Sequence, residues 1–270
     1  MVSATAPIGM FDSGLGGLTV ARAVIDLLPN EDLLYFGDTA RCPYGPRDPA
    51  EVRRFAIEIV DYLVAEGVKL IVVACNSAES AAFYEEVGRA DVVPIVTVIE
   101  PGVGAALAAT TNRKIGLIGT EATIRSQAYE AAFERTKANV ELVTQACPKF
   151  VEFVEAGDTT SDALMAAAVE YLTPVKDAGV DTLILGCTHY PLLSGVIQYV
   201  MGGDVVLVSS SEPTANEVYA RLLEADLLDR SDDPGSLRFV VSADNATQLE
   251  LGRRFLGPEV TDLELHEWDG

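Results

Sequence analysis

Short runs of Val, Ile and Leu alternate with longer amphipathic stretches along most of the chain. Such runs fit strands buried on both faces of a parallel sheet, and the stretches between them have helical spacing. We expect strands at residues 8–11, 33–36, 70–74, 95–98, 115–118, 140–144, 182–185, 205–208 and 238–241. The clearest helices are expected at residues 18–28, 49–66, 161–178 and 214–228. This alternation predicts a doubly wound α/β fold.

An internal repeat indicates two similar halves. Residues 67–77 align without gaps on residues 179–189, which places Cys75 and Cys187 at the same position, 112 residues apart. A weaker match, at an offset of 107, sets residues 8–13 against residues 115–120. The repeat predicts two pseudo-symmetric α/β domains with mainly parallel sheets and the active site in the cleft between them.

The two cysteines of the repeat each follow a predicted buried strand. Open α/β sheets bind their ligands at the carboxyl ends of strands, and the small polar residues after each cysteine predict that a helix begins there. If the halves face each other about a pseudo-twofold axis, Cys75 and Cys187 approach one cleft from opposite sides.

Composition fits an ordinary globular protein of two domains. The 270 residues are 49% apolar and 22% charged. The net charge of -22 disfavours nucleic acid and anionic membranes as partners. The sequence contains no secretory signal and no apolar run long enough to span a membrane, so we expect a cytoplasmic protein. Four widely spaced cysteines fit a reducing compartment better than disulfides.

A pair of thiols suits one particular reaction. Inverting a carbon that carries a weakly acidic hydrogen requires a base on one face and an acid on the other. Thiols have an ordinary pKa of about 8.5, so both protonation states are accessible near neutral pH. A single free cysteine is more often a small packed hydrophobe. The symmetric placement of Cys75 and Cys187 favours the acid/base interpretation, whereas Cys42 and Cys147 lack such a partner.

Two flanking residues make the halves unequal. His189 lies two residues after Cys187 and is predicted to assist it as a proton partner or through its charge. Asp12 ends the first strand where the other half has Gly119. His266 carries no predicted role. Cys42 precedes residues 43–45 closely enough to line the cleft.

Neither a cofactor nor a metal is predicted. The glycine-rich segment at residues 12–17 lacks the G-x-G-x-x-G spacing and instead predicts a tight turn with exposed N–H groups. None of the five lysines lies in a strand-end motif, which disfavours a pyridoxal phosphate Schiff base. Two distant histidines and no C-x-x-C pair disfavour a metal site.

With these motifs assembled, the chain resembles the glutamate racemases of the aspartate/glutamate racemase superfamily. The similar segments are residues 11–19 (FDSGLGGLT), 38–45 (DTARCPYG), 74–78 (ACNSA), 146–151 (ACPKFV) and 186–192 (GCTHYPL). The family usually has Thr at the position of Ser77, which keeps the hydroxyl.

The resemblance implies cofactor-independent interconversion of L- and D-glutamate, which supplies D-glutamate for peptidoglycan in a bacterium. Cys75 and Cys187 would be the catalytic pair, assisted by Asp12 and His189 respectively. Glu155 would be the acidic helper of the histidine, with Glu152 as the alternative. The residues expected to bind substrate are Asp12, Ser13, Pro43, Tyr44, Gly45, Asn76, Ser77, Thr120, Thr188 and His189. The resemblance also implies a homodimer and a discontinuous first domain of residues 1–98 and 208–270 around a second domain of residues 99–207.

Two other functions compete with this interpretation. A racemase of the same superfamily acting on aspartate would use the same pair of cysteines, and pocket size would decide between the substrates. A two-lobed binding protein for small dicarboxylates would need the cysteines only for packing.

Overall fold

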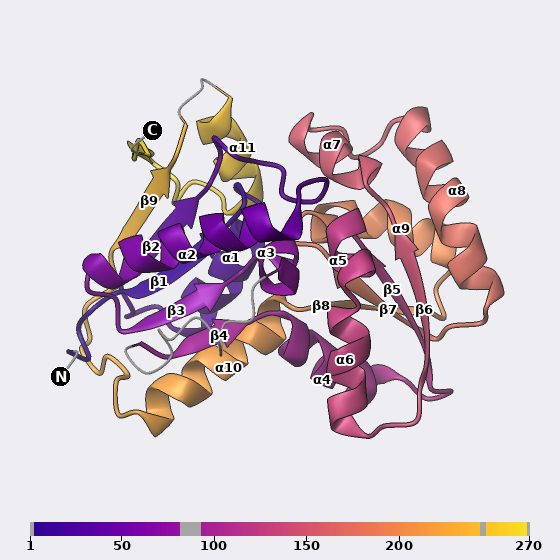
Figure 1. Cartoon of the computed structure of the whole chain (residues 1–270), viewed down its shortest axis with the longest axis horizontal. Coiled ribbons are helices and arrows are strands. Elements are labelled where there is room, and N and C mark those ends of the chain that lie inside the picture. The colour runs from indigo at the N-terminus through magenta and orange to yellow at the C-terminus, as the bar shows by residue number, and fades with distance from the viewer. Residues whose placement is uncertain (1–2, 82–92, 244–246, 269–270) are drawn as a thin grey trace.

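The computed structural model describes residues 3–81, 93–243 and 247–268, and it contains two parallel sheets that lie side by side (Figure 1). The six-stranded sheet has the order β10-β9-β2-β1-β3-β4, and the four-stranded sheet has the order β6-β5-β7-β8. The strands are β1 (Ile8–Asp12), β2 (Leu33–Gly37), β3 (Leu70–Val73), β4 (Ile95–Thr97), β5 (Lys114–Gly119), β6 (Glu141–Ala146), β7 (Thr182–Gly186), β8 (Val206–Ser209), β9 (Leu237–Val241) and β10 (Glu264–Leu265).

Helices flank both sheets and connect most of the strands (Figure 1). They are α1 (Leu18–Leu27), α2 (Pro49–Ala65), α3 (Asn76–Ala81), α4 (Ile99–Ala109), α5 (Glu121–Ser126), α6 (Ala128–Thr136), α7 (Lys149–Glu155), α8 (Asp162–Asp177), α9 (Ser194–Met201), α10 (Ser211–Glu224) and α11 (Gln248–Phe255), together with the 3₁₀ helix η2 (Tyr190–Leu193). The predicted α/β fold with two sets of parallel strands is confirmed.

Strand register reproduces the sequence repeat. Ile8 of β1 pairs with Leu70 of β3. In the second half, the residue equivalent to Ile8 is Ile115 of β5 and the residue equivalent to Leu70 is Thr182 of β7. These two residues also pair with each other. The order β4-β3-β1-β2 in one sheet therefore corresponds to β8-β7-β5-β6 in the other. Corresponding strands end at the same level of their sheets.

Alternate residues of each strand bury against different helices. In β3, Ile71 and Val73 pack with apolar side chains of α2 and α3, whereas Leu70 and Val72 belong to the cluster that contains α1 and α10. In the other sheet, Leu117 packs with α4 and α6. Because both faces are covered, these strands are apolar throughout, which is why they are easily recognised in the sequence.

Side-chain caps fix where several helices begin. The Asp48 carboxylate accepts from the Ala50 N–H, 2.8 Å away, and Pro49 occupies the first turn of α2. The Ser161 hydroxyl accepts from the Leu164 N–H at the start of α8. Such caps satisfy N–H groups that have no partner within the helix. Both helices were predicted within one residue of these starts.

The predicted element bounds differ from the structure in a few places. All nine predicted strands are present within two residues of their expected ends, and the two-residue β10 is too short to give a sequence signal. Helix α10 begins at Ser211 because Pro213 is tolerated in a first turn, and it is followed by Asp226 at a φ of 54°. The predicted helix at residues 214–228 was displaced toward the C-terminus.

A further correction concerns Cys187. Cys75 directly precedes α3, as predicted, but Cys187 is followed by a turn and the 3₁₀ helix that contains Pro191. Helix α9 begins only at Ser194. The two cysteines share a strand-end position but not the local structure that follows it. None of the described helices combines the length and the apolar character needed to cross a bilayer.

A buried ion pair joins the N-terminal segment and the segment before β9 to the six-stranded sheet. The Lys69 ammonium, fully buried beside β3, pairs with the Glu31 carboxylate and donates to the Ala4 carbonyl. Glu31 also accepts from the backbone N–H of Asp229, 2.8 Å away. A buried pair of this kind is costly to break because the remaining charge has lost its solvation.

Removing only one charge should therefore destabilise the fold. Lys69→Met leaves the Glu31 carboxylate buried without its cation, and we expect the free energy of unfolding to fall by about 3–5 kcal/mol in urea titrations. The double variant Lys69→Met/Glu31→Leu should recover most of that loss. Equal stability of the single and double variants would contradict this role of the pair.

Candidate active site

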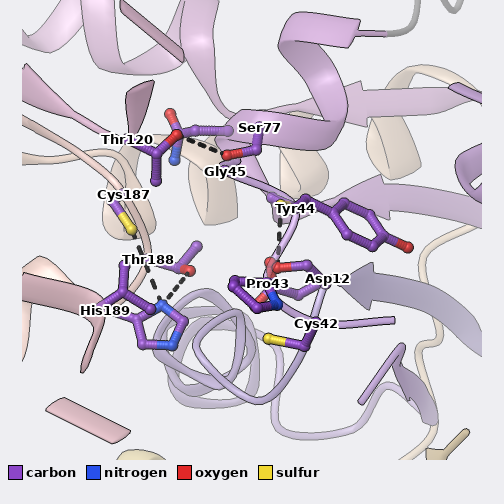
Figure 2. A pocket seen from close by; sticks show the side chains of 14 residues that line it. Asp12, Cys42, Pro43, Tyr44, Gly45, Ser77, Thr120, Cys187, Thr188 and His189 are labelled. Carbon is purple, nitrogen blue, oxygen red and sulfur yellow. Dashed lines mark hydrogen bonds between the residues drawn. The ribbon is translucent and has the colours of Figure 1, made fainter. Parts of the chain in front are cut away.

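One pocket collects the carboxyl ends of strands from both sheets. Asp12 ends β1 and Cys75 follows β3, while Thr120 follows β5 and Cys187 follows β7. The residues that line it are Asp12, Ser13, Cys42, Pro43, Tyr44, Gly45, Cys75, Asn76, Ser77, Thr120, Val151, Cys187, Thr188 and His189. The cavity that these side chains leave open is small, about 20 Å³ in volume. Figure 2 shows Cys187 and His189 on the opposite side from Asp12 and Cys42.

The Cys75 side of the pocket holds a buried thiol next to a carboxylate. Cys75 Sγ lies 3.6 Å from Ser13 Oγ and accepts from the Ala78 N–H in the first turn of α3, 3.4 Å away. Burial and the negative charge of Asp12 raise the pKa of the Cys75 thiol well above its ordinary value, although the hydrogen bonds with Ala78 and Ser13 oppose this. The thiol form is therefore favoured here.

The Cys187 side holds a sulfur next to a histidine. His189 Nδ1 lies 3.9 Å from Cys187 Sγ, and Nε2 lies 3.2 Å from Glu155 Oε1. Burial disfavours the imidazolium, but the hydrogen bonds with Cys187 and Glu155 outweigh it and raise the pKa of His189 to about 10. The bond with His189 also lowers the pKa of Glu155. A cationic imidazole next to Cys187 stabilises negative charge on its sulfur.

Close packing against a glycine fixes the histidine. A Cβ added at Gly16 would lie 2.6 Å from Thr188 Oγ1 and still closer to the His189 ring. The residue has to be glycine because the loop after β1 passes directly over the histidine side of the pocket. Phe255 also contacts the His189 ring in an edge-to-face arrangement, with 5.5 Å between the ring centroids.

The loop after β2 contributes Cys42 to Gly45 and is held by one carboxylate. The Tyr44 ring turns away from Cys187 and His189 (Figure 2), and its hydroxyl donates to Asp38 Oδ2. Asp38 is fully buried and also accepts from Arg41 Nε, Ser242 Oγ and Trp268 Nε1. Four donors fill the acceptor positions of a carboxylate. Asp38 thus joins this loop to the C-terminal part of the chain.

Side chains from segments that follow strands of the two sheets contact each other directly. Ser77 Oγ and Thr120 Oγ1 lie 2.8 Å apart. Tyr129, on α6, donates from its hydroxyl to Asn76 Oδ1 at 2.7 Å. These contacts join the start of α3, directly after Cys75, to the segment that follows β5.

Two buried polar atoms of the pocket residues have no hydrogen-bond partner within the described part of the chain. They are Asp12 Oδ1 and Asn76 Nδ2. The other carboxylate oxygen of Asp12 accepts from the Gly17 N–H at 2.7 Å. Buried polar atoms normally have partners, so the free acceptor and the free donor indicate where a ligand with both polarities binds.

The pocket is lined by all twelve predicted positions: the two cysteines, Asp12, His189 and the other residues expected to bind substrate. Glu155 does not line the pocket but contacts His189 through a hydrogen bond. It is Glu155, not Glu152, whose carboxylate oxygen approaches the His189 ring. Cys42 lines the pocket, and its thiol lies 3.7 Å from Glu155 Oε1. Cys147 is buried outside it, and all four cysteines are free.

Sequence reasoning missed Val151, Asp38 and Tyr129. Val151 and Asp38 lie in quoted motifs but lack a chemical signature that would distinguish them from packing residues. Tyr129 lies outside every motif. Across residues 3–81, 93–243 and 247–268, no three His, Cys, Asp or Glu side chains form a cluster able to hold a metal ion.

Comparison with known proteins places the chain in a family. The family model described as Asp/Glu/hydantoin racemase matches residues 17–218. A glutamate racemase from Beutenbergia cavernae is 56% identical over 96% of this chain and 92% of that protein. One from Mycobacterium leprae is 51% identical over 98% of this chain and 97% of that protein.

A solved structure agrees with these relatives. The crystal structure of glutamate racemase from Francisella tularensis in complex with D-glutamate superposes with a TM-score of 0.91 and 35% identity, over 98% of each chain. The chain therefore belongs to the Asp/Glu/hydantoin racemase family, as an amino-acid racemase of the glutamate racemase group.

Proposed function

We propose that this enzyme interconverts L- and D-glutamate by proton transfer at the α-carbon, with Cys75 and Cys187 as the two acid/base groups. The observation that carries the proposal is electrostatic. Two buried cysteines at equivalent strand ends line one pocket, one next to the Asp12 carboxylate and the other next to the His189 imidazolium. A negative neighbour favours the thiol form of one cysteine, and a positive neighbour favours the thiolate form of the other. The proposed reaction requires one sulfur in each form.

In the proposed reaction, the thiolate of one cysteine removes the α-proton and the C–H bond breaks to leave a carbanion. The thiol of the other cysteine then gives its proton to the opposite face, so a new C–H bond forms with inverted configuration. One thiol and one thiolate remain, with their roles exchanged. His189 stabilises the thiolate of Cys187, Asp12 assists Cys75, and Glu155 orients His189 and keeps it charged.

The unpartnered atoms support an amino acid as substrate. Asp12 Oδ1 is an acceptor for an ammonium group, and Asn76 Nδ2 is a donor for a carboxylate. We propose that the remaining contacts come from hydroxyls and backbone groups of Ser13, Pro43, Tyr44, Gly45, Ser77, Thr120, Thr188 and His189. Glutamate, rather than aspartate, is supported by the names of the relatives, which are glutamate racemases at 50–56% identity.

The family resemblance extends the proposal beyond the reaction. We propose that the product D-glutamate is used for peptidoglycan synthesis, that the enzyme acts in the cytoplasm and that it forms a homodimer. We also propose domain boundaries that follow the two sheets, with residues 1–98 and 208–270 in one domain and residues 99–207 in the other. The contiguity of β5–β8 in the chain supports these boundaries.

The reaction can be tested directly by circular dichroism. Purified protein without added cofactor should abolish the optical activity of L-glutamate solutions, leave L-aspartate largely unchanged and incorporate solvent deuterium at the α-carbon. Preference for aspartate would contradict the substrate, and binding of glutamate without racemisation would favour a non-catalytic binding protein.

The cysteine pair can be tested by matched substitutions. Cys75→Ala and Cys187→Ala each remove one acid/base group, so kcat/KM should fall by at least about 10²–10⁴-fold in both directions. Cys147→Ala is the control, because this cysteine is equally buried but does not line the pocket. Undiminished racemisation by either single variant would exclude the two-cysteine mechanism.

Glu155 should set the alkaline limit of activity. His189 has a pKa of about 10, raised above its ordinary value, so it is cationic below that pH and loses its charge as pH rises through it. Glu155→Gln removes the negative partner, so the pKa of His189 falls and the alkaline limb of the kcat/KM profile should move to lower pH by about one unit or more. Glu152→Gln should leave the profile in place. Identical profiles for all three proteins would contradict the role of Glu155.

A further inference from the structure

We propose that Tyr129 is a positioning residue that orients the side-chain amide of Asn76, so that its NH₂ group faces the pocket as a donor for a substrate carboxylate. The inference rests on the proposed function, because it assigns a role within the same pocket. Tyr129 lies on α6 beside the four-stranded sheet, and Asn76 begins α3 after the six-stranded sheet. Tyr129, next to the four-stranded sheet, therefore orients Asn76, which follows a strand of the six-stranded sheet.

The hydrogen bond determines which end of the amide faces the substrate. The Tyr129 hydroxyl donates to Asn76 Oδ1 at 2.7 Å, and both residues are buried. With Oδ1 engaged, the NH₂ group is at the free end, and Asn76 Nδ2 has no partner within the described part of the chain. A reversed amide would present its oxygen to the pocket, and an oxygen repels a carboxylate.

Two glycines lie next to the Tyr129 side chain, within van der Waals range. A Cβ at Gly186, the residue before Cys187, would lie 3.5 Å from Tyr129 Cε2 and only 2.8 Å from the Ile118 carbonyl oxygen. A Cβ at Gly102 of α4 would lie 3.8 Å from the Tyr129 hydroxyl oxygen. The ring is completely buried between these elements and packs with Ile99. Its hydroxyl is therefore held at one place.

The hydroxyl also keeps its proton. Burial, together with the negative charges of Glu79 and Cys187, raises the pKa of Tyr129 well above its ordinary value. A buried phenol O–H requires an acceptor, and Asn76 Oδ1 is the acceptor that this environment supplies. The tyrosine thus remains a donor, and the orientation of the amide does not change over the working pH range.

Because the amide contacts the substrate in the ground state and the transition state alike, its loss should affect binding more than chemistry. Tyr129→Phe removes one oxygen and leaves the ring in its slot, but it frees the amide to rotate. We expect KM for both enantiomers of glutamate to rise about tenfold while kcat changes by less than about threefold. The control is Tyr190→Phe, which removes an equally buried hydroxyl bonded to the Cys147 carbonyl at 2.8 Å. It should leave KM unchanged.

A double-variant cycle separates positioning from a general structural effect. If Tyr129 acts through Asn76, then Asn76→Ala raises KM and adding Tyr129→Phe to it raises KM no further. Asn76→Asp keeps an acceptor for Tyr129 but loses the donor, so its KM should exceed that of Tyr129→Phe. Urea titrations of each variant confirm that the protein assayed is folded.

Unchanged KM in folded Tyr129→Phe would overturn the proposal, and so would additive effects of the Tyr129 and Asn76 substitutions. These outcomes differ from failure of the proposed function. Absence of glutamate racemisation by both the wild-type chain and Tyr190→Phe would remove the function, and the inference with it.

Discussion

Parallel pairing in a shared register is the constraint on which the site depends. A parallel sheet places the carboxyl ends of its strands along one edge. Ile8 pairs with Leu70 in one sheet and Ile115 pairs with Thr182 in the other, so the two central strands of each sheet have the same register and end at equivalent positions. The loops that follow meet in one pocket because two such edges face each other. No single loop contains the site, so the distances between its residues depend on how the two sheets pack against each other.

Cys75 and Cys187 occupy equivalent backbone positions, but the side chains next to them differ. Asp12 ends β1, whereas the equivalent strand β5 ends in Gly119, and only the second half has a histidine after its cysteine. The strand-end positions are therefore equivalent, but their electrostatics are polarised across the pocket. The net charge of -22 is compatible with the proposed anionic substrate, because the unpartnered Asn76 Nδ2 and the His189 imidazolium are local donors and charges are screened over longer distances.

The strands and the cysteine pair were predictable because buried parallel strands and a repeated motif leave strong signals in sequence. Asp12 was predictable because it ends the first strand of the weaker repeat, His189 because it lies two residues after Cys187, and Ser13 only through the family resemblance. Tyr129 and Asp38 were not, since each acts through contacts with residues distant in the chain: Tyr129 donates to Asn76, 53 residues earlier, and Asp38 accepts from Ser242 and Trp268, more than 200 residues later. The end of α10 was misplaced because Asp226 adopts a left-handed φ that favours glycine.

The attachment of Trp268 to Asp38 has a consequence for biosynthesis. Strands β5 to β8 form a contiguous stretch of chain, so the four-stranded sheet can be assembled on the ribosome while later residues are still being added. The six-stranded sheet needs β9 and β10, and Asp38, which holds the loop that carries Tyr44, accepts from Trp268 in the segment after β10. The loop beside the cysteines therefore gains its Ser242 and Trp268 contacts with Asp38 later than the four-stranded sheet can form, so the last part of the pocket to be fixed is the part that carries Tyr44.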